Sequence, residues 1–414
     1  MKNPFENIRF PALLLVALII FALIFNLSIT TENQFNLLLA SILNGNLHLP
    51  YRVTDSVYYK GLYYWPLGPF PALFLLPFSY FSLIFYNSLI PQGIVNFLCV
   101  AFIILLAYRI SSKFGFNKNN SVWISIALVF SSVFFLSAYL PWCWYFSQTV
   151  AFLFGLLSFI EFLGKKRYLL IGIFHGFLFM TRFTAGFGVL FYLLQIVFSR
   201  DLIKQKIENT FKMLIPIILS GILLLLYNYA RFGNAFDNGY TIANNWIPNQ
   251  EVYRYEMLHY GLFSVKNIPT NIYYYFINMP APVLERLPDF DRRIFATPKD
   301  MIVHLVFPYI KVRNPGVSFF VVSIIFILMF RNKLKTCNSR YALITSMFIT
   351  LFLLTYYWTG WIQIGPRYMI DLLPFLFIIF LESFEKKEVL FWQKLIILVG
   401  AVFNIFLFYT LTIK

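Results

Sequence analysis

Two acidic residues that follow the first long apolar segment have the residue type and surroundings of a catalytic base. Asp55 lies in an aromatic-rich loop between Arg52 and Pro69. Partial removal from water raises the basicity of such a carboxylate, which suits a general base. The alternative is that Asp55 stabilises a turn before Ser56 by bonding nearby backbone amides. Glu32 is the second carboxylate, and its alternative role is to interact with the dipole at the start of the next helix.

Arginines at the ends of other apolar segments complement these carboxylates. Arg182 lies between two closely spaced apolar segments, and an arginine at the bilayer centre costs about 3 kcal/mol, so we expect it to face the protein interior or a wet cavity. Arg367 precedes Tyr368 and lies one helical turn before Asp371. This spacing allows a local ion pair, whereas a guanidinium without such a pair matches the oxygens of a phosphate. Arg182 and Arg367, together with Tyr368 and Asp371, are therefore candidate substrate-binding residues.

Lys60 and Arg231 are further candidates for binding a phosphate. Tyr63 and Tyr64 follow Lys60 in the same aromatic loop and are predicted to bind substrate with it. Lysine and arginine at a membrane interface also extend to lipid headgroups while their stems stay in apolar surroundings. Both interpretations of Lys60 and Arg231 remain open at this point.

The sequence lacks the motifs of several other enzyme classes. We find no Walker motif, GxGxxG, HExxH or GxSxG, which disfavours chemistry driven by a nucleotide. The four histidines are isolated, and His175 lies inside an apolar segment, where a packed hydrogen-bond donor between helices is favoured over a ligand. Three distant cysteines show no CxxC spacing. We therefore expect neither a metal nor a cofactor.

Composition identifies the chain as a membrane protein. Hydrophobic residues make up 60% of its 414 residues and charged residues 12%, and the mean hydropathy is +0.72. Charged residues are about a quarter of an average soluble domain. The net charge of +16 comes from small basic groups at the ends of apolar segments, which orient membrane proteins and do not indicate nucleic-acid binding. The sequence predicts one integral membrane domain over residues 1–414.

Apolar length and charged flanks predict about eleven transmembrane helices in an all-α polytopic fold. The predicted spans are 11–30, 88–109, 121–139, 147–163, 168–181, 184–199, 213–230, 316–330, 341–358, 368–382 and 389–410. With a cytoplasmic N-terminus and an uncleaved first span, every short loop on the cytoplasmic side is basic. This rule predicts the orientation of the chain.

The predicted outer side carries two long loops, 31–87 and 231–315. Residues 68–86 are apolar, but counting them as a span would place the basic loop after Arg109 outside, and the prolines Pro66, Pro69, Pro71 and Pro77 suit a straight helix poorly. We interpret 68–86 as an interfacial or re-entrant helix, with a twelfth span as the alternative. Apolar residues between Gln34 and Leu47 recur at helical spacing and predict a second interfacial helix. Both loops are rich in aromatic residues, so we expect them to pack on the membrane surface.

Three short motifs stand at the predicted outer ends of apolar segments. The first runs from Asp55 through Tyr63 and Tyr64 to Gly68-Pro69, the second runs from Asn228 to Tyr240, and the third is Gly365-Pro366-Arg367-Tyr368. Together with the two interfacial helices, they resemble the integral-membrane glycosyltransferases of the GT-C fold. The resemblance is greatest to bacterial relatives of the protein mannosyltransferases and of the lipid A aminoarabinose transferases.

This resemblance implies a GT-C-like fold and a glycosyltransferase that takes a sugar from a polyprenyl-phosphate donor. The acceptor would be a hydroxyl or amine of a glycan, lipid or protein, and a single displacement would invert the anomeric carbon. The resemblance further implies Asp55 as the base, the donor phosphate near Arg182, Arg231 and Arg367, and no cofactor besides the lipid-linked donor. The protein would be a multi-pass protein of the plasma (inner) membrane, with its active site on the outer face.

Two departures from the family pattern concern the site. Many members have an aspartate directly after the first span, where this chain has Thr31-Glu32-Asn33. Either Glu32 replaces that aspartate or Asp55 is the working carboxylate, and the intact motif around Asp55 favours the second interpretation. The aminoarabinose transferases also have a Glu-Lys-Pro-Pro run where this chain has Trp65-Pro66-Leu67-Gly68-Pro69, so their lysine is missing.

Two functions from other classes are the alternatives. A lipid or polysaccharide transporter would depend on residues along a central path more than on Asp55, although Asp371 and Glu161 are the only acidic residues close to such a path. A polymerase of surface glycans would also have a large outer loop, but with several arginine-rich motifs in it.

Overall fold

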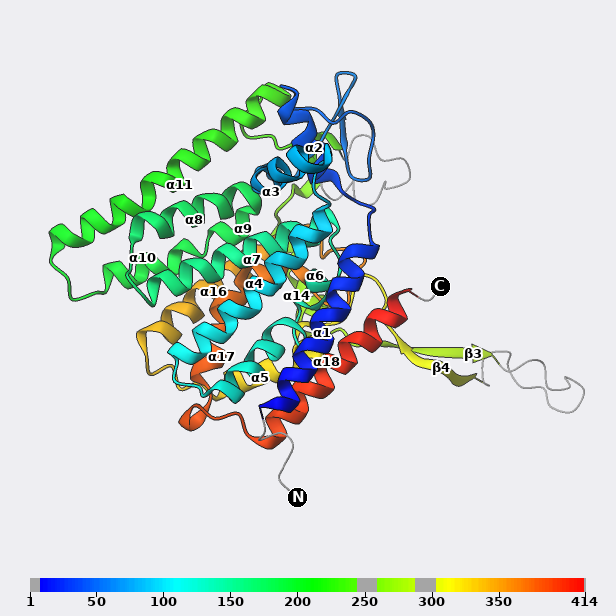
Figure 1. Cartoon of the computed structure of the whole chain (residues 1–414), viewed down its shortest axis with the longest axis vertical. Coiled ribbons are helices and arrows are strands. Elements are labelled where there is room, and N and C mark those ends of the chain that lie inside the picture. Colours follow the sequence, from blue (N-terminus) through cyan, green and yellow to red (C-terminus); the bar gives the residue numbers. More distant parts are fainter. Residues whose placement is uncertain (1–7, 244–258, 287–302, 413–414) are drawn as a thin grey trace, which may run out of the picture.

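The computed structural model describes residues 8–243, 259–286 and 303–412, and it is mostly helical (Figure 1). Six of its helices are long and apolar enough to cross a membrane. They are α1 (Arg9–Ser28), α4 (Gln92–Lys113), α7 (Cys143–Phe162), α11 (Ile203–Phe232), α16 (Cys337–Thr355) and α18 (Phe391–Thr412). The chain thus has the helical, apolar character of a polytopic membrane protein that its composition predicts.

Shorter helices occupy the other predicted spans. They are α5 (Lys118–Val129), α6 (Phe135–Tyr139), α8 (Tyr168–Thr181), α9 (Phe183–Gly186), α10 (Val189–Val197), α15 (Phe319–Val322), the 3₁₀ segments η4 (Ile324–Arg331) and η5 (Arg367–Leu372), and α17 (Leu373–Glu382). The 14 residues of α8 make a helix of roughly 21 Å, which is shorter than the hydrocarbon core of about 30 Å. The count of eleven spans therefore stays a prediction.

The loops predicted to be cytoplasmic meet at one end of the molecule. Lys113 Nζ lies 3.5 Å from the carbonyl oxygen of Leu163, and Arg331 pairs with Glu385 of η6 (Glu385–Lys387) at 3.2 Å. The loops predicted to be outside meet at the opposite end, where the Cys143 backbone N–H donates to the Glu32 carbonyl at 3.2 Å. The helices therefore alternate in direction as predicted, whereas which end faces the cytoplasm stays a prediction.

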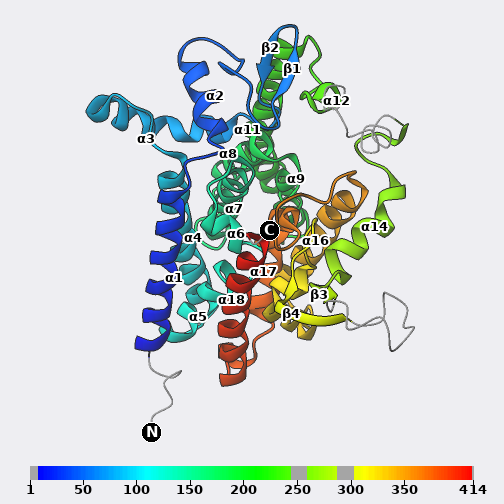
Figure 2. The ribbon, with the colours of Figure 1, turned by 90° about the vertical axis from the view of Figure 1, so that its right-hand side faces the viewer.

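The first outer loop folds into two helices and a β-hairpin. Its helices are α2 (Gln34–Leu43) and α3 (Phe70–Tyr86), and its strands are β1 (Val57–Tyr59) and β2 (Leu62–Tyr64), which pair antiparallel. Figure 2 shows α3 lying across the direction of α1 and α4 and extending away from the bundle. The second half of α3 exposes Tyr80, Phe81, Ile84, Phe85 and Tyr86. This orientation and apolar surface suit an interfacial helix.

Two predicted spans, 121–139 and 316–330, are not continuous helices. The first is interrupted between α5 and α6, and the second at Ser323, where φ is −130°. The Val133 N–H donates to Ser323 Oγ at 2.8 Å, and Asn404 Nδ2 of α18 lies 3.2 Å from the Phe130 carbonyl oxygen and 3.0 Å from that of Val322. Backbone groups inside a membrane need such partners within the protein. Hydropathy does not show these side-chain contacts, so the sequence predicted unbroken spans.

The second outer loop contains short helices and a hairpin that the sequence did not predict. Its described elements are α12 (Tyr240–Ala243), η2 (Val265–Asn267), α14 (Ile268–Ile272), the π-helical η3 (Tyr273–Ile277), and the antiparallel strands β3 (Ala281–Arg286) and β4 (Val303–Lys311). Residues 244–258 and 287–302 of the predicted loop 231–315 lie outside the described residues.

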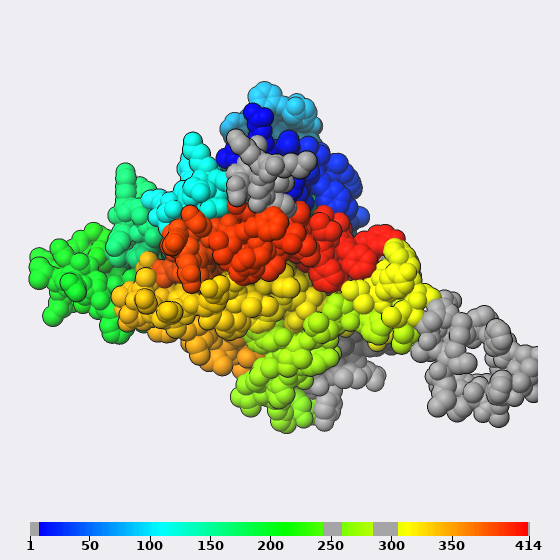
Figure 3. Space-filling model, turned by 90° about the horizontal axis from the view of Figure 1, so that it is seen from below, coloured from blue at the N-terminus to red at the C-terminus, as the bar shows by residue number. Residues whose placement is uncertain are grey.

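The two ends of the chain pack against each other. Figure 3 shows α18, in red, between the blue N-terminal segment and the yellow segment around 303–331. The rings of Phe25 and Phe408 meet at a centroid distance of 5.4 Å. This contact joins the outer ends of α1 and α18.

Glycines allow α8 and α11 to approach closely. A Cβ on Gly172 would lie 2.2 Å from the Met213 carbonyl oxygen, and one on Gly176 would lie 2.3 Å from Ser220 Oγ. Small residues four apart are a common means of helix association in membranes, where apolar burial against lipid contributes little. α11 is otherwise exposed along most of its length.

Substituting Gly172 tests this close packing. We expect Gly172→Ala to destabilise the protein by about 1–3 kcal/mol, because backbone atoms of α11 must move to make room for the methyl group. The matched control is Gly221→Ala on α11, since a Cβ there meets nothing within 4 Å. Thermal unfolding of both purified variants in detergent measures the difference. Equal unfolding temperatures would contradict the assigned packing.

Candidate active site

A cavity of about 1480 Å³ opens at the end where the predicted outer loops meet. The first outer loop, the starts of α7 and α9, and the segment 352–368 contribute to its walls. The predicted residues that line it are Glu32, Asp55, Arg182, Arg367 and Tyr368. Folding thus brings together residues that are more than 300 positions apart in the sequence.

Asp55 presents its carboxylate to this cavity. Ser56, and not Asp55, stabilises the turn in which both residues lie. Ser56 Oγ donates to the Val53 carbonyl at 2.6 Å and accepts from the Val53 N–H at 3.2 Å. The carboxylate of Asp55 accepts a hydrogen bond from the Trp144 side chain. Asp55 has a φ of 61°, a left-handed conformation that is uncommon for residues other than glycine and clusters at functional sites. Its side chain remains exposed within the cavity.

The surroundings raise the pKa of Asp55 above the usual range of an aspartate. The largest cause is that protein atoms replace bulk water around the carboxylate, and the negative charge of Glu32 acts in the same direction. The positive charge of Arg367 and the hydrogen bond from Trp144 oppose the rise. An accessible carboxylate with a raised pKa is the arrangement expected of a general base.

Glu32 lies beside the Asp55 loop and is half-buried. Its carboxylate accepts a hydrogen bond from Thr54 Oγ1 at 3.2 Å and another from the Gln34 side chain. Its carbonyl accepts from the Cys143 N–H. Glu32 therefore connects the Asp55 loop with α2 and with the start of α7.

Asp371 pairs with Arg182, and the local pair with Arg367 that the spacing suggested is not formed. Arg182 Nε and Nη2 lie 2.7 and 3.1 Å from the two carboxylate oxygens, and Thr184 Oγ1 donates to the same carboxylate. The side chain of Asp371 is fully buried and that of Arg182 is 12% exposed. One-turn spacing does not ensure an ion pair, because Arg182 approaches from another helix with better bidentate geometry. The charge of Arg182 is thus compensated within the protein.

Arg367 is a buried cation that forms no contact ion pair with a described residue. The residue is 7% exposed, and none of the ion pairs between described residues includes it. Its Nε and Nη1 are buried and have no hydrogen-bond partner among the described residues. The guanidinium lies 5.4 to 5.7 Å from the ring centroids of Trp144, Tyr145 and Tyr368. Buried donors without partners cost free energy, which an anionic ligand would offset.

Besides Asp371, four of the predicted substrate-binding residues lie outside the described wall of the cavity. Lys60 is at the tip of the β1–β2 hairpin over the Tyr59 ring, and Tyr63 pairs with Tyr58. Tyr64 packs against Phe232. The buried Arg231 donates to the Trp65 carbonyl at 2.6 Å and to Asn228 Oδ1 at 2.7 Å. These contacts tie the hairpin to the end of α11.

An aromatic wall of the cavity was not predicted. It includes Trp144 of α7 and the residues Tyr356, Tyr357, Trp358 and Trp361, which follow α16. The sequence carries a signal for it, the dense run Tyr356-Tyr357-Trp358-Thr359-Gly360-Trp361, but such runs also mark ordinary membrane interfaces.

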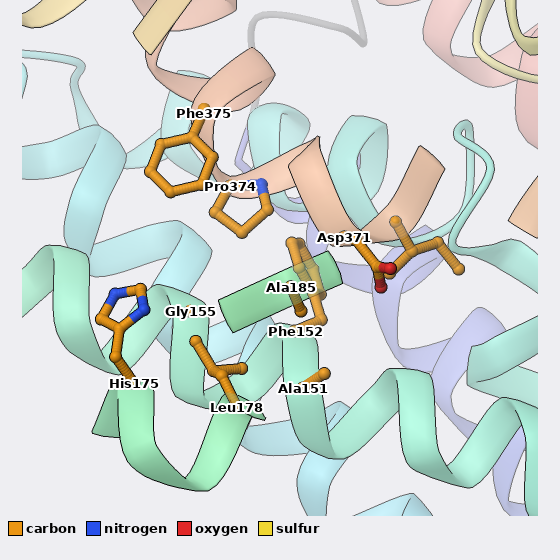
Figure 4. Close-up of a pocket in the computed structure, with 10 residues that line it drawn as sticks. Ala151, Phe152, Gly155, His175, Leu178, Ala185, Asp371, Pro374 and Phe375 are labelled. Atoms are coloured by element: carbon orange, nitrogen blue, oxygen red, sulfur yellow. The ribbon is translucent and has the colours of Figure 1, made fainter. Parts of the chain in front are cut away.

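A second, much smaller cavity of about 10 Å³ lies behind the Arg182–Asp371 pair. Figure 4 shows His175 and Asp371 on opposite sides of it, with Gly155, Ala185 and Pro374 between them. This space holds one water molecule at most, so it cannot receive a substrate. The His175 ring packs against Tyr192 at a centroid distance of 5.1 Å, but neither ring nitrogen has a hydrogen-bond partner among the described residues. The structure thus shows the packing and not the predicted hydrogen bond.

Within the described part of the chain, no three His, Cys, Asp or Glu side chains gather as a metal site. The expectation of a reaction without a metal or cofactor stays a prediction.

No family model and no curated protein matches the chain. Among solved structures, the chain is similar to the oligosaccharyltransferase of Archaeoglobus fulgidus in its apo form, with 12% sequence identity and a TM-score of 0.40. The match covers 96% of this chain and 55% of the archaeal chain, so the chain spans about half the length of that protein. At this similarity, the activity has to be inferred from the cavity itself.

Arg182 has a carboxylate partner and Arg367 has none among the described residues, so substitutions at the two places should affect the unfolding temperature differently. We expect Asp371→Asn to destabilise the protein by about 3–5 kcal/mol, because it leaves the Arg182 charge buried without a partner. Adding Arg182→Met to Asp371→Asn should recover part of this loss. Arg367→Met should leave the unfolding temperature unchanged or raise it, since no carboxylate loses its partner. Thermal unfolding in detergent measures all variants, and equal losses for Asp371→Asn and Arg367→Met would contradict these assignments.

Proposed function

We propose that the protein is a glycosyltransferase that moves a sugar from a polyprenyl-phosphate donor to an acceptor hydroxyl at the outer face of the membrane. The observation that carries this proposal is one cavity that contains both the accessible carboxylate of Asp55, whose pKa is raised, and the unpaired guanidinium of Arg367. A group transfer from phosphate needs both a base for the acceptor and a cation for the leaving group. The motif resemblance to GT-C glycosyltransferases supports the same activity.

Arg367 would bind the donor phosphate. Arg367 lines the cavity and forms no ion pair among the described residues, and a guanidinium can donate to two phosphate oxygens at once. The aromatic rings around it limit access of water. Arg182 lines the same cavity, but Asp371 already compensates its charge. Arg182 therefore adds less net positive charge and holds the end of α8 against η5.

Asp55 would act as the base in a single displacement. The acceptor O–H transfers its proton to the Asp55 carboxylate while the acceptor oxygen forms a bond to the anomeric carbon. The bond between that carbon and the phosphate oxygen breaks, and its electron pair stays on the phosphate, where Arg367 stabilises the charge. Attack from the face opposite the leaving group inverts the anomeric carbon. Glu32 holds the Asp55 loop and raises its pKa, so we assign it a positioning role.

The donor's lipid would leave the cavity through its apolar side. Phe183 and Phe263 line the cavity and are 55% and 44% exposed, and Phe352 of α16 contacts both rings. Such a surface suits a polyprenyl chain that stays in the bilayer while its phosphate reaches the headgroup level. The proposal places the protein in the plasma membrane with a cytoplasmic N-terminus and an outer-face site, an orientation that rests on the basic short loops of the sequence.

Substitution of the two carboxylates tests the proposal. We expect Asp55→Asn to lower transfer about a hundred- to ten-thousandfold, because the acceptor loses its base, and Glu32→Gln to lower it less than about tenfold. The readout is mass spectrometry of envelope glycans from cells that lack the chain and receive each variant. Asp201→Asn, at the opposite end of the molecule, is the matched control and should retain activity.

The outcomes separate the candidates. Full transfer by Asp55→Asn together with loss in Glu32→Gln would make Glu32 the base. Full transfer by both folded and inserted variants would overturn a carboxylate mechanism.

The pKa of Asp55 also predicts the pH dependence. Because the ionised carboxylate accepts the proton, transfer should fall as pH decreases through the raised Asp55 pKa. Glu32→Gln removes a negative neighbour and lowers that pKa, so the acid limb should move to lower pH. Trp144→Phe removes a hydrogen bond to the carboxylate and should move the limb to higher pH. Initial rates in membrane preparations across pH measure both shifts, and identical acid limbs in all three proteins would contradict Asp55 as the base.

A further inference from the structure

Two tryptophans form a nearly parallel pair on the wall of the large cavity. The rings of Trp358 and Trp361 have a centroid distance of 6.0 Å and an interplanar angle of 25°. Both residues line the cavity, and Trp361 is 48% exposed. Large aromatic side chains usually bury most of their surface, so an exposed ring inside a cavity is an available contact surface. We call this pair the tryptophan platform.

The fold holds the platform in place. Gly360, between the two tryptophans, has a φ of 111°, and a Cβ there would lie 2.4 Å from Gln363 Oε1. Gln363 is buried and donates to the Thr359 carbonyl at 3.0 Å and to that of Pro315. Tyr145 Oη donates to the Ile362 carbonyl at 2.6 Å. A segment fixed on several sides loses little conformational freedom when a ligand binds.

The platform also lies beside the candidate phosphate site. The Tyr145 ring that holds Ile362 is 5.7 Å from the Arg367 guanidinium. The cavity volume of about 1480 Å³ exceeds the roughly 300–1000 Å³ of a site for one drug-sized ligand. The same cavity therefore has room for a donor headgroup and a second molecule.

Sugars match this surface. A pyranose ring has an apolar face of C–H groups that packs on the electron-rich face of an aromatic ring, while its hydroxyls need hydrogen bonds at the edge. Asn238, Tyr240 and Tyr357 line the same cavity and carry polar groups that can form such bonds.

We infer that the tryptophan platform is a saccharide subsite that binds the acceptor, so that the acceptor is a glycan. The identification of the bound saccharide as the acceptor rests on the proposed function. Saccharide binding by the tryptophan platform does not depend on it. The cavity around the stacked pair has room for more than one pyranose, so binding should increase with the length of the saccharide.

Saccharide binding by the full chain in lipid nanodiscs tests this inference. The probes are maltotriose, mannotriose and chitotriose, each compared with its methyl monosaccharide by saturation-transfer NMR and titration. We expect at least one trisaccharide to bind more tightly than its monosaccharide. Trp361→Ala should weaken that binding roughly tenfold, and Trp361→Phe should weaken it less. Trp392→Ala is the control, since Trp392 is 42% exposed on α18, at the opposite end of the molecule.

A parallel measurement separates this inference from the proposed function. Native mass spectrometry of the same samples measures binding of undecaprenyl phosphate, which Arg367→Met should abolish and Trp361→Ala should retain. Retention by Trp361→Ala also shows that this variant is folded. If undecaprenyl phosphate binds but no trisaccharide does, the saccharide subsite is overturned and the proposed function stands.

The remaining outcomes are equally decisive. If a monosaccharide binds as tightly as its trisaccharide, the platform receives the donor sugar and the acceptor assignment fails. If trisaccharide binding is the same in Trp361→Ala and wild type, the platform is not the subsite. If undecaprenyl phosphate does not bind the wild-type chain, the proposed function fails.

Discussion

The ion pair between Arg182 and Asp371 determines how charge is distributed in the candidate site. It joins the end of α8 to η5 with bidentate geometry and uses the only carboxylate one turn away from Arg367. Arg367, which lines the cavity, consequently has no ion pair among the described residues, and its Nε and Nη1 are buried without hydrogen-bond partners there. Two arginines that look alike in the sequence thus have different surroundings, one in a buried ion pair and one among aromatic rings.

Sequence reasoning selected residues that the fold brings to one cavity, but not their partners. Asp55, Glu32, Arg182 and Arg367 were selected because charged residues at the ends of apolar segments are costly and therefore informative, and Tyr368 was selected as the neighbour of Arg367. The pairing of Asp371 was not predictable, because residue spacing reports only local neighbours and Arg182 comes from a distant helix. The aromatic wall was not predicted for a similar reason. In the sequence, Trp358 and Trp361 are indistinguishable from the aromatic residues of an ordinary membrane interface, and only the folded chain places them in the cavity wall.

The fold itself was predicted best where one physical rule dominates. Charge bias and apolar length grouped the loops into two ends and distinguished α3, whose first half packs on α7 and α8 and whose second half is exposed, from the helices that run along α1. Apolar length predicted unbroken helices at residues 130–134 and at Ser323, but the helices are interrupted there although the hydropathy stays high. There, polar side chains from other segments satisfy the backbone, and no local pattern reports on contacts between segments that are far apart in the sequence.

Those breaks have a consequence for the order in which the molecule is completed. The amide of Asn404, on the last helix, supplies hydrogen bonds to carbonyls at Phe130 and Val322 in both interrupted segments. During synthesis from the N-terminus, both segments exist before their donor does. The two interruptions gain their full set of hydrogen bonds only when α18 has entered the bundle. The final helix thus completes the hydrogen bonding of both interrupted segments. A chain that ends before Asn404 would leave the carbonyls of Phe130 and Val322 without this donor in an apolar environment.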